Sequence, residues 1–276
     1  MRVEFIDVGG VNTRVIYEGD KSKKAILLIH GFGIGAESWL LNIDELGKDY
    51  YVVAPDQIGH GFTDPVSLNG GPPHPVNLKH LFDVADKMGI DSFVPCGSSY
   101  GALMAALMWF EAPDRIPQVI LNGTGSCFNT EEELANALQG TLKNAGMAIR
   151  TPTLESCKQR MANTMYDISM VPDDVLLSQL TAYAQPTYIG WWEEAMKGMM
   201  DIPAVRPYRI LERLEDIDVD TLIVWGREDP RGIHERAVEA CKRMPKAELV
   251  TFEKCGHLPY MEYPDLFHDA VRKFVN

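Results

Sequence analysis

Three side chains, a serine, an aspartate and a histidine, have the types and the chain order that nucleophilic catalysis needs. The segment GSSYG contains the pattern G-x-S-x-G only in the frame that centres Ser99, which excludes Ser98. Asp229 follows in the segment REDP, and His257 follows in CGHLPY. In such a set the histidine takes the proton of the serine hydroxyl, and the aspartate orients the histidine. The sequence therefore predicts a nucleophile at Ser99 with His257 as its base and Asp229 as the orienting acid.

Each of these residues also has a plain structural explanation. A lone G-x-S-x-G can be a glycine turn for close packing, and a loop aspartate or a single histidine is often only a cap or a hydrogen-bonding group. Their joint occurrence after successive strands favours catalysis. Glu228 is the nearest rival for the acid position, and we expect it to face solvent. We expect His30 to hold loop backbone and His60 to belong to a tight turn.

A glycine-rich loop, HGFGIGA, follows the apolar run AILLI and has two interpretations. One is a dinucleotide-binding fingerprint with Asp56 as the acidic residue, but two strands precede it and the next helix begins too late to hold a pyrophosphate. The other is an oxyanion loop. In that interpretation the backbone N–H groups of Phe32 and Tyr100 stabilise the oxyanion that forms when Ser99 attacks a carbonyl.

The elements that must position these residues are short apolar runs alternating with helical segments. The first two runs alternate apolar and polar residues, as half-exposed antiparallel strands do, and the later runs are nearly continuous, as in parallel strands covered on both faces. We predict an α/β fold with a mostly parallel eight-stranded sheet flanked by helices. The predicted strands are VEFIDV, TRVIYE, AILLIH, YVVAP, SFVPCG, QVILNG, TLIVWG and ELVTFE.

The stretch 127–209 has no strand pattern. It is rich in methionine, and its helical patterns are broken by prolines. We predict a helical cap, or lid, over 127–209, inserted between two parts of an α/β core at 1–126 and 210–276. Its apolar side chains could wall a pocket, although most of them are expected to pack the lid onto the core: Met161, Met165, Trp191, Trp192, Met196, Met199 and Met200. The Gly/Pro-dense segment Ser67–Asn77 reads as a loop.

Composition narrows the class of partner. The net charge of −13 repels nucleic acid and anionic lipid surfaces, and no apolar run is long enough to span a membrane. Five cysteines at long spacings suggest neither a zinc site nor a disulfide framework. We expect a soluble cytoplasmic protein with a small-molecule substrate and with no metal and no cofactor. A homodimer is left open.

Together the motifs HGFG, DQIGHG, GSSYGA, WGREDP and CGHLPYMEYP resemble those of the α/β-hydrolase superfamily. The resemblance runs from the first strand to the last helix and implies a helical lid between the sixth and seventh strands. Within the superfamily the chain looks most like the meta-cleavage-product hydrolases, serine enzymes that split carbon–carbon bonds in vinylogous 1,5-diketones. The segments GGVNTRVIYEG and TLESCKQRMANTMYDISMVPDDVL carry that likeness.

Three positions depart from the pattern of those enzymes. They usually have Asn before the nucleophile, an Arg-Trp pair in the lid and Trp after the histidine, whereas this chain has Ser98, Gln179-Leu180 and Leu258. In that family the arginine binds a substrate carboxylate. We therefore predict first a serine hydrolase that cleaves an ester, lactone or similar acyl bond in a small, largely apolar substrate. Carbon–carbon hydrolysis is the alternative, and a hydrolase-like ligand receptor with weak turnover is a second one.

Overall fold

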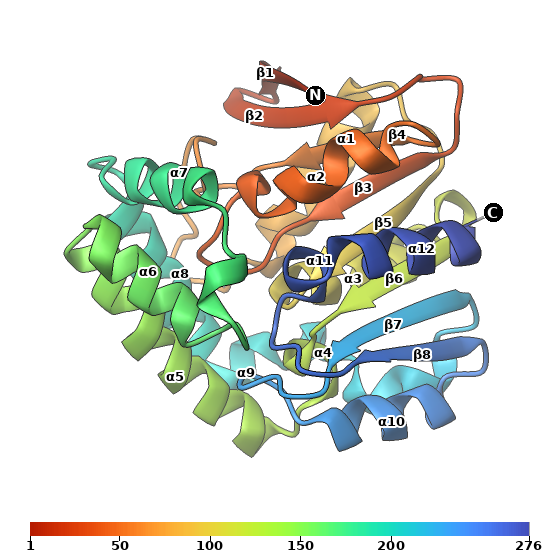
Figure 1. The fold of residues 1–276 in the computed structure, drawn as a ribbon. Helices are drawn as coiled ribbons and strands as arrows, with labels where there is room; N and C mark the ends of the chain where they lie inside the picture. The colour runs from red at the N-terminus through yellow and green to blue at the C-terminus, as the bar shows by residue number, and fades with distance from the viewer. Residues whose placement is uncertain (276) are drawn as a thin grey trace.

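Eight strands form one mixed sheet in the computed structural model, which describes residues 1–275 (Figure 1). Their order across the sheet is β1-β2-β4-β3-β5-β6-β7-β8. β1 pairs with β2 and β2 with β4 in antiparallel fashion, and all other neighbours are parallel. The predicted fold class is therefore confirmed. The strands are β1 (Arg2–Val8), β2 (Val11–Glu18), β3 (Ala25–Ile29), β4 (Tyr51–Pro55), β5 (Phe93–Ser98), β6 (Gln118–Asn122), β7 (Asp220–Gly226) and β8 (Ala247–Phe252).

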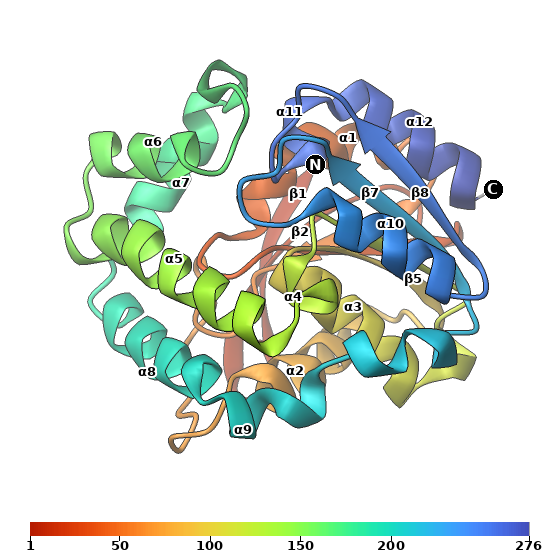
Figure 2. The same cartoon turned by 90° about the horizontal axis from the view of Figure 1, so that it is seen from below.

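Helices cover both faces of the sheet, which is why its central strands are continuous apolar runs. Every residue of β3, β4 and β5 is buried, whereas β1 at the edge buries only Ile6 and Val8. α1 packs with α11 and α12 over one face, and α2, α3 and α10 lie over the other (Figures 1 and 2). These helices are α1 (Leu40–Leu46), α2 (His74–Lys87), α3 (Tyr100–Glu111), α10 (His234–Arg243), α11 (Pro259–Glu262) and α12 (Pro264–Val275).

Between β6 and β7 the described chain forms helices only. The longest, α5, begins with a capping box in which Thr130 and Glu133 each accept the other's backbone N–H. We call α5, α6, α7 and α8 the lid helices; they lie together beside one end of the sheet, at the left in Figure 1. That residues 127–209 form a separate cap stays a prediction. The helices here are α4 (Gly125–Phe128), α5 (Glu131–Arg150), α6 (Leu154–Ala162), α7 (Asp173–Tyr183), α8 (Tyr188–Met200) and α9 (Ile202–Val205).

Short 3-10 helices complete the helical segments of the described chain. They are η1 (Ala36–Trp39), η2 (Pro113–Arg115), η3 (Ile168–Met170), η4 (Arg206–Tyr208) and η5 (Leu211–Asp216). One sequence expectation was wrong here. α2 begins at His74, inside the segment that we read as a loop, because proline is tolerated in the first turn of a helix, where the N–H groups have no acceptor within the helix.

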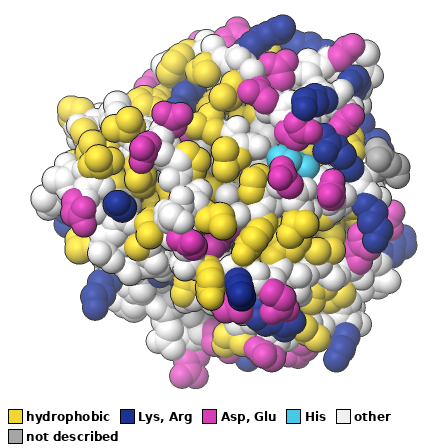
Figure 3. Space-filling view, in the orientation of Figure 1, with side chains coloured by type: hydrophobic (Ala, Val, Ile, Leu, Met, Phe, Trp, Pro, Cys, Tyr) yellow, Lys and Arg dark blue, Asp and Glu magenta, His cyan; other side chains and the backbone are white. Residues whose placement is uncertain are grey.

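The surface carries charged side chains of both signs. On the face in Figure 3, Lys and Arg side chains are interspersed with Asp and Glu instead of forming one basic patch. None of the helices described over residues 1–275 has the length and apolar character needed to cross a membrane. All five cysteines are free thiols. The expected compartment and the open question of a homodimer stay predictions.

Candidate active site

Ser99 lies on a very tight turn between β5 and α3. Its backbone has φ 54° and ψ −115°, a conformation that L-residues with side chains rarely adopt. The flanking glycines make this turn possible. A Cβ on Gly97 would lie 2.1 Å from the carbonyl oxygen of Gly101, and a Cβ on Gly101 would lie 2.2 Å from the carbonyl oxygen of Ile29. The spacing of the motif thus has a steric cause in the packing of α3 against β3 and β5.

The loop after β3 lies against this turn. A Cβ added to Gly31 would stand 3.4 Å from Cβ of Ser99. Gly31 therefore contacts the serine, and Phe32 is the next residue along the chain. Tyr100 is the first residue of α3, where the backbone N–H has no acceptor within the helix and the helix dipole is positive. Phe32 and Tyr100 also pack ring against ring, with 5.7 Å between centroids. Both residues of the predicted oxyanion hole therefore lie beside Ser99.

A buried ion cluster holds the loop after β3 in place. Arg14 donates to both oxygens of Asp56, at 2.6 and 2.9 Å, and to Glu37 at 2.7 Å. Asp56 in turn accepts the N–H of Ala36 at 2.7 Å and that of Phe62 at 2.8 Å. Asp56, the acidic residue of the dinucleotide interpretation, is thus engaged in ordering two loops.

Two histidines support the same region. His30 Nδ1 donates to the Gly31 carbonyl at 2.8 Å, and its Nε2 accepts the Gln57 N–H at 2.9 Å. Because Nε2 accepts, Nδ1 carries the proton in the neutral ring. Burial lowers the pKa of His30 to about 4. The Nδ1 of His60 lies 3.1 Å from the Ile58 carbonyl oxygen within the following turn. Both structural expectations for these histidines are confirmed.

His257 and Asp229 form a close pair. Nδ1 of His257 lies 2.9 Å from Oδ1 and 2.8 Å from Oδ2 of Asp229, whose side chain is fully buried. The backbone N–H of Arg231 donates to the same carboxylate at 2.7 Å. Glu228 is exposed and instead accepts the backbone N–H of Cys255 at 3.0 Å. Of the two candidate acids, the one in contact with the imidazole is Asp229.

The loop that carries His257 is tied to the lid. The backbone N–H of His257 donates to the carbonyl of Thr164, between α6 and η3, at 3.0 Å. The buried carboxylate of Glu262 accepts the N–H of Gly256 at 2.8 Å and that of Tyr166 at 2.7 Å, and it joins both segments. Burial raises the pKa of Glu262, although these N–H groups act in the opposite direction.

Ser99 and His257 line one cavity between the core and the lid helices; the space not filled by atoms, counted together with the opening to solvent, is about 860 Å³. Phe32 and Tyr100 line it as well, while Asp229 lies behind the histidine. Two arginines and no acidic residue are among the described residues that line it, in a chain whose net charge is −13. The other polar lining residues are Ser98, Ser126, Asn129, Thr141, Asn144 and Thr164, and the apolar ones are Ile34, Leu134, Ala137, Leu138, Ala145, Met161, Met199 and Leu258.

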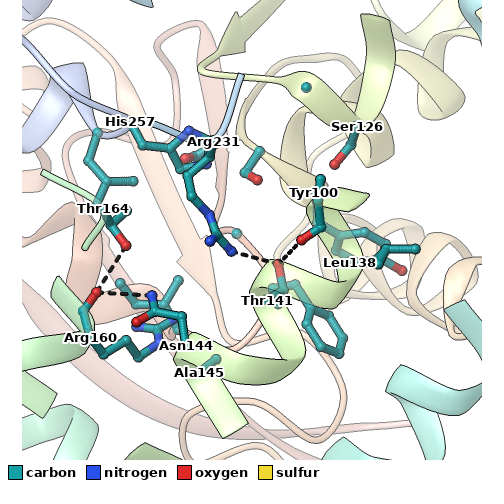
Figure 4. Close-up of a pocket in the computed structure, with 18 of the residues that line it drawn as sticks. Tyr100, Ser126, Leu138, Thr141, Asn144, Ala145, Arg160, Thr164, Arg231 and His257 are labelled. Carbon is teal, nitrogen blue, oxygen red and sulfur yellow. Dashed lines mark hydrogen bonds between the residues drawn. The ribbon is translucent and has the colours of Figure 1, made fainter. Parts of the chain in front are cut away.

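The two arginines, Arg160 and Arg231, were not found by sequence reasoning (Figure 4). Arg160 is on α6 and is 8% exposed. It donates to Oε1 of Gln179 at 3.3 Å, and its Nε has no partner in the described chain. Neither arginine has an ion-pair partner among residues 1–275. A single arginine in an amphipathic helix belongs to no motif, so no signal for Arg160 was present in the sequence. The only available signal for Arg231 was its place two residues after Asp229.

Most of the seven apolar lid residues pack in the core, as expected. Only Met161 and Met199 line the cavity, and the other five lie in the hydrophobic core or pack against it. Gln179, which stands where the resemblance places an arginine, is fully buried and contacts the guanidinium of Arg160. The missing arginine on α7 therefore does not remove positive charge from this part of the cavity. Within the described chain, no cluster of three or more His, Cys, Asp or Glu side chains has the arrangement of a metal site.

Comparison with known proteins identifies the family. The model of the alpha/beta hydrolase family matches residues 26–270. A 2-hydroxy-6-oxo-6-phenylhexa-2,4-dienoate hydrolase of Burkholderia cepacia is 26% identical, over 99% of this chain and 95% of that protein. A 2-hydroxy-6-oxononadienedioate/2-hydroxy-6-oxononatrienedioate hydrolase of Paraburkholderia phymatum is 27% identical, over 97% and 92%.

Solved structures give the same result. The meta-cleavage product hydrolase CumD of Pseudomonas fluorescens is 28% identical and superposes with a TM-score of 0.79, over 99% of this chain and 97% of that one. The sequence prediction ranked ester cleavage above carbon–carbon cleavage, and these relatives support the second more than the first. The chain belongs to the alpha/beta hydrolase family and is a hydrolase similar to the meta-cleavage product hydrolases.

Proposed function

We propose that this protein hydrolyses a carbon–carbon bond next to a ketone in a small substrate that carries a carboxylate. The observation that carries this proposal is the buried guanidinium of Arg160, which lines the same cavity as Ser99 and His257 and has no acidic partner in the described chain. Burying a cation without a counter-ion is costly, and a substrate carboxylate would offset that cost. The relatives named as dienoate hydrolases support the same class of substrate.

The proposed reaction begins with attack of Ser99 Oγ on the ketone carbon. His257 takes the hydroxyl proton, and Asp229, held at Nδ1, orients the imidazole and stabilises its charged form. The backbone N–H groups of Phe32 and Tyr100 stabilise the resulting oxyanion. When the carbon–carbon bond breaks, its electron pair leaves with the carbon fragment, which takes the proton from His257. Water, activated by the same histidine, then releases the acyl group from Ser99.

Carbon is a poor leaving atom unless its electron pair is delocalised. In a 2-hydroxy-6-oxo-dienoate the proton of the 2-hydroxyl group must first move to the carbon next to the ketone. The pair released by cleavage can then spread along the conjugated chain toward the carboxylate end. A guanidinium at that end therefore stabilises charge that develops in the transition state as well as the charge already present on the substrate. Arg160 is the residue to which we assign this role.

Ester hydrolysis is the second candidate. Ser98 and Leu258 both line the cavity, at positions where the resemblance to the carbon–carbon hydrolases fails. A smaller hollow adjoins the cavity, shares Tyr100 and Leu138 with it, and is lined mainly by apolar residues such as Leu103 and Val205. Its apolar lining favours an apolar group over a charged one on this side of the cavity.

The two functions separate in one assay. The purified protein is given a 2-hydroxy-6-oxo-dienoate and, separately, short p-nitrophenyl esters, and kcat/KM is measured for each. We expect a higher kcat/KM for the dienoate, followed as loss of its chromophore. Faster turnover of the esters, with the dienoate left intact, would reject carbon–carbon hydrolysis and favour the second candidate. The variant Ser99→Ala should be inactive on both.

A further inference from the structure

Arg231 occupies a position that the proposed reaction does not use. It lies in the loop after β7, and its side chain crosses from the core to α5, where Nη2 donates to Thr141 Oγ1 at 2.7 Å (Figure 4). Thr141 Oγ1 in turn donates to the carbonyl of Ala137 at 3.0 Å. A neutral hydroxyl is thus the side-chain partner that holds this guanidinium, although arginine pairs most strongly with carboxylates and phosphates.

The acidic groups near Arg231 are engaged elsewhere. Asp229 faces His257 and takes only the backbone N–H of Arg231. Glu133, on α5, is bound to Arg236 at 2.8 Å and to the backbone N–H of Thr130 at 2.8 Å. Burial, together with the like charge of Arg160, lowers the pKa of Arg231. The cavity lining therefore contains two cations that repel each other, with Asp229 acting in the opposite direction on Arg231, and a bound anion would relieve that repulsion.

Arg231 also lies where the cavity meets the surface. A surface groove runs between α5 and the loop after β7, and it shares Asn129, Ala137 and Arg231 with the cavity. Arg160, by contrast, stands on α6 beside the loop after β3, where its Nη2 would lie 3.5 Å from a Cβ on Gly33. The two guanidinium groups come from different walls, one from the lid and one from the core.

We propose that Arg231 is a specificity-determining residue that binds a second anionic group, so that the preferred substrate carries a negative charge at each end. Arg160 receives the first carboxylate, and Arg231, positioned by Thr141, receives the second, at the mouth of the cavity. The inference rests on the proposed function for the direction of the substrate, but the recognition of a second anion does not depend on which bond is cleaved.

The test compares matched substrates that differ in one charge. The first pair is a 2-hydroxy-6-oxo-dienoate whose acyl end carries a carboxylate, and its analogue with an isopropyl group in place of that carboxylate. The second pair is p-nitrophenyl hemisuccinate and p-nitrophenyl 4-methylpentanoate. For each pair, the ratio of the two kcat/KM values is measured in the wild type and in Arg231→Met. Arg227→Met is the matched control, because Arg227 is exposed and pairs with Glu253.

We expect the wild type to prefer the carboxylated member, and Arg231→Met to reduce that preference about 10- to 150-fold, the range for a hydrogen bond to a charged group. Arg227→Met should leave the ratio within about twofold, as a screened surface charge does. Thr141→Val should retain most of the preference, because the guanidinium remains. If only the ester pair is cleaved and it shows this pattern, the carbon–carbon proposal fails and the assignment of Arg231 stands.

Two kinetic outcomes would overturn the assignment. One is a wild type with no preference for the carboxylated member of whichever pair it cleaves. The other is an equal loss on both members in Arg231→Met and in Thr141→Val, which would make Arg231 a latch between lid and core. Binding is read independently as the rise in Tm of Ser99→Ala with glutarate. That rise should persist with Arg227→Met added and disappear with Arg231→Met added. Absence of any rise in Ser99→Ala would also reject the inference.

Discussion

Replacing Arg160 with methionine separates binding from stability at one position. The guanidinium is buried, and its hydrogen bonds are to neutral groups, Oε1 of Gln179 at 3.3 Å and Sδ of Met161 at 3.7 Å. Methionine has a similar length and suits the surrounding apolar side chains. Arg160→Met therefore removes a charge and a donor while it keeps most of the packing.

The two expected effects have opposite signs. Loss of a hydrogen bond to a substrate carboxylate is worth about 1.5 to 3 kcal/mol, so kcat/KM for a dienone acid should fall roughly 10- to 150-fold. Removal of an unpaired buried charge should raise the free energy of unfolding by about 1 kcal/mol, because the desolvation cost disappears. For a chain of 276 residues, that gain corresponds to a rise in Tm of roughly 2 to 4 °C.

The assay pairs kinetics with thermal denaturation monitored by circular dichroism. Arg206→Met is the control, because Arg206 is exposed and bound to Glu131 at 2.9 Å, away from the lining of the cavity. It should leave kcat/KM unchanged and should not raise Tm. A variant Arg160→Met that turns over the dienone acid at the wild-type rate would refute the role of Arg160. A large fall in Tm would refute the argument from its unpaired charge.

Three further predictions follow from the geometry. Ser99→Ala should lower kcat at least about 10³-fold without unfolding the protein, and a fluorophosphonate probe should label Ser99 and not Ser98, which peptide mapping by mass spectrometry would show. Gly101→Ala should destabilise the fold by about 1 to 3 kcal/mol or more in urea denaturation, because its Cβ would lie 2.2 Å from the carbonyl oxygen of Ile29; an unchanged midpoint would contradict this. Burial lowers the pKa of His30 to about 4, so below about pH 6.5 this histidine is protonated in the unfolded chain but still neutral in the folded protein. The free energy of unfolding should therefore fall, by up to about 3 kcal/mol, as the pH drops from 6.5 to 4. The loss should be smaller in His30→Asn, and equal pH slopes for the two proteins would count against this account.

The sheet and the polar residues at its carboxyl edge could be predicted from the sequence, because both leave local signals. A buried parallel strand must be apolar along its whole length, as AILLI is, and the turn at Ser99 needs glycine at two fixed positions. The choice of Asp229 over Glu228 also followed from local spacing after the end of β7.

The charge of the cavity could not be predicted in the same way. Arg160 lines the cavity because of how α6 packs on the core, and Arg231 because its side chain reaches α5; neither arrangement leaves a pattern in the sequence. The sequence prediction took Gln179, in place of the arginine of the related hydrolases, as evidence against an acidic substrate. That inference failed for a related reason. A guanidinium can reach the same place from a different helix, so a single aligned position does not report whether the charge is present.

The bond from the His257 N–H to the Thr164 carbonyl, supported by Glu262, links the candidate base directly to the lid. If this segment of the lid swings outward to admit a substrate, either this hydrogen bond breaks or His257 moves with the lid. If His257 moves with the lid, its imidazole leaves the Asp229 carboxylate that orients it. His257 would then be in position to act as the base only when the lid is closed. With the lid open, Ser99 would lie in a water-filled cavity without a base.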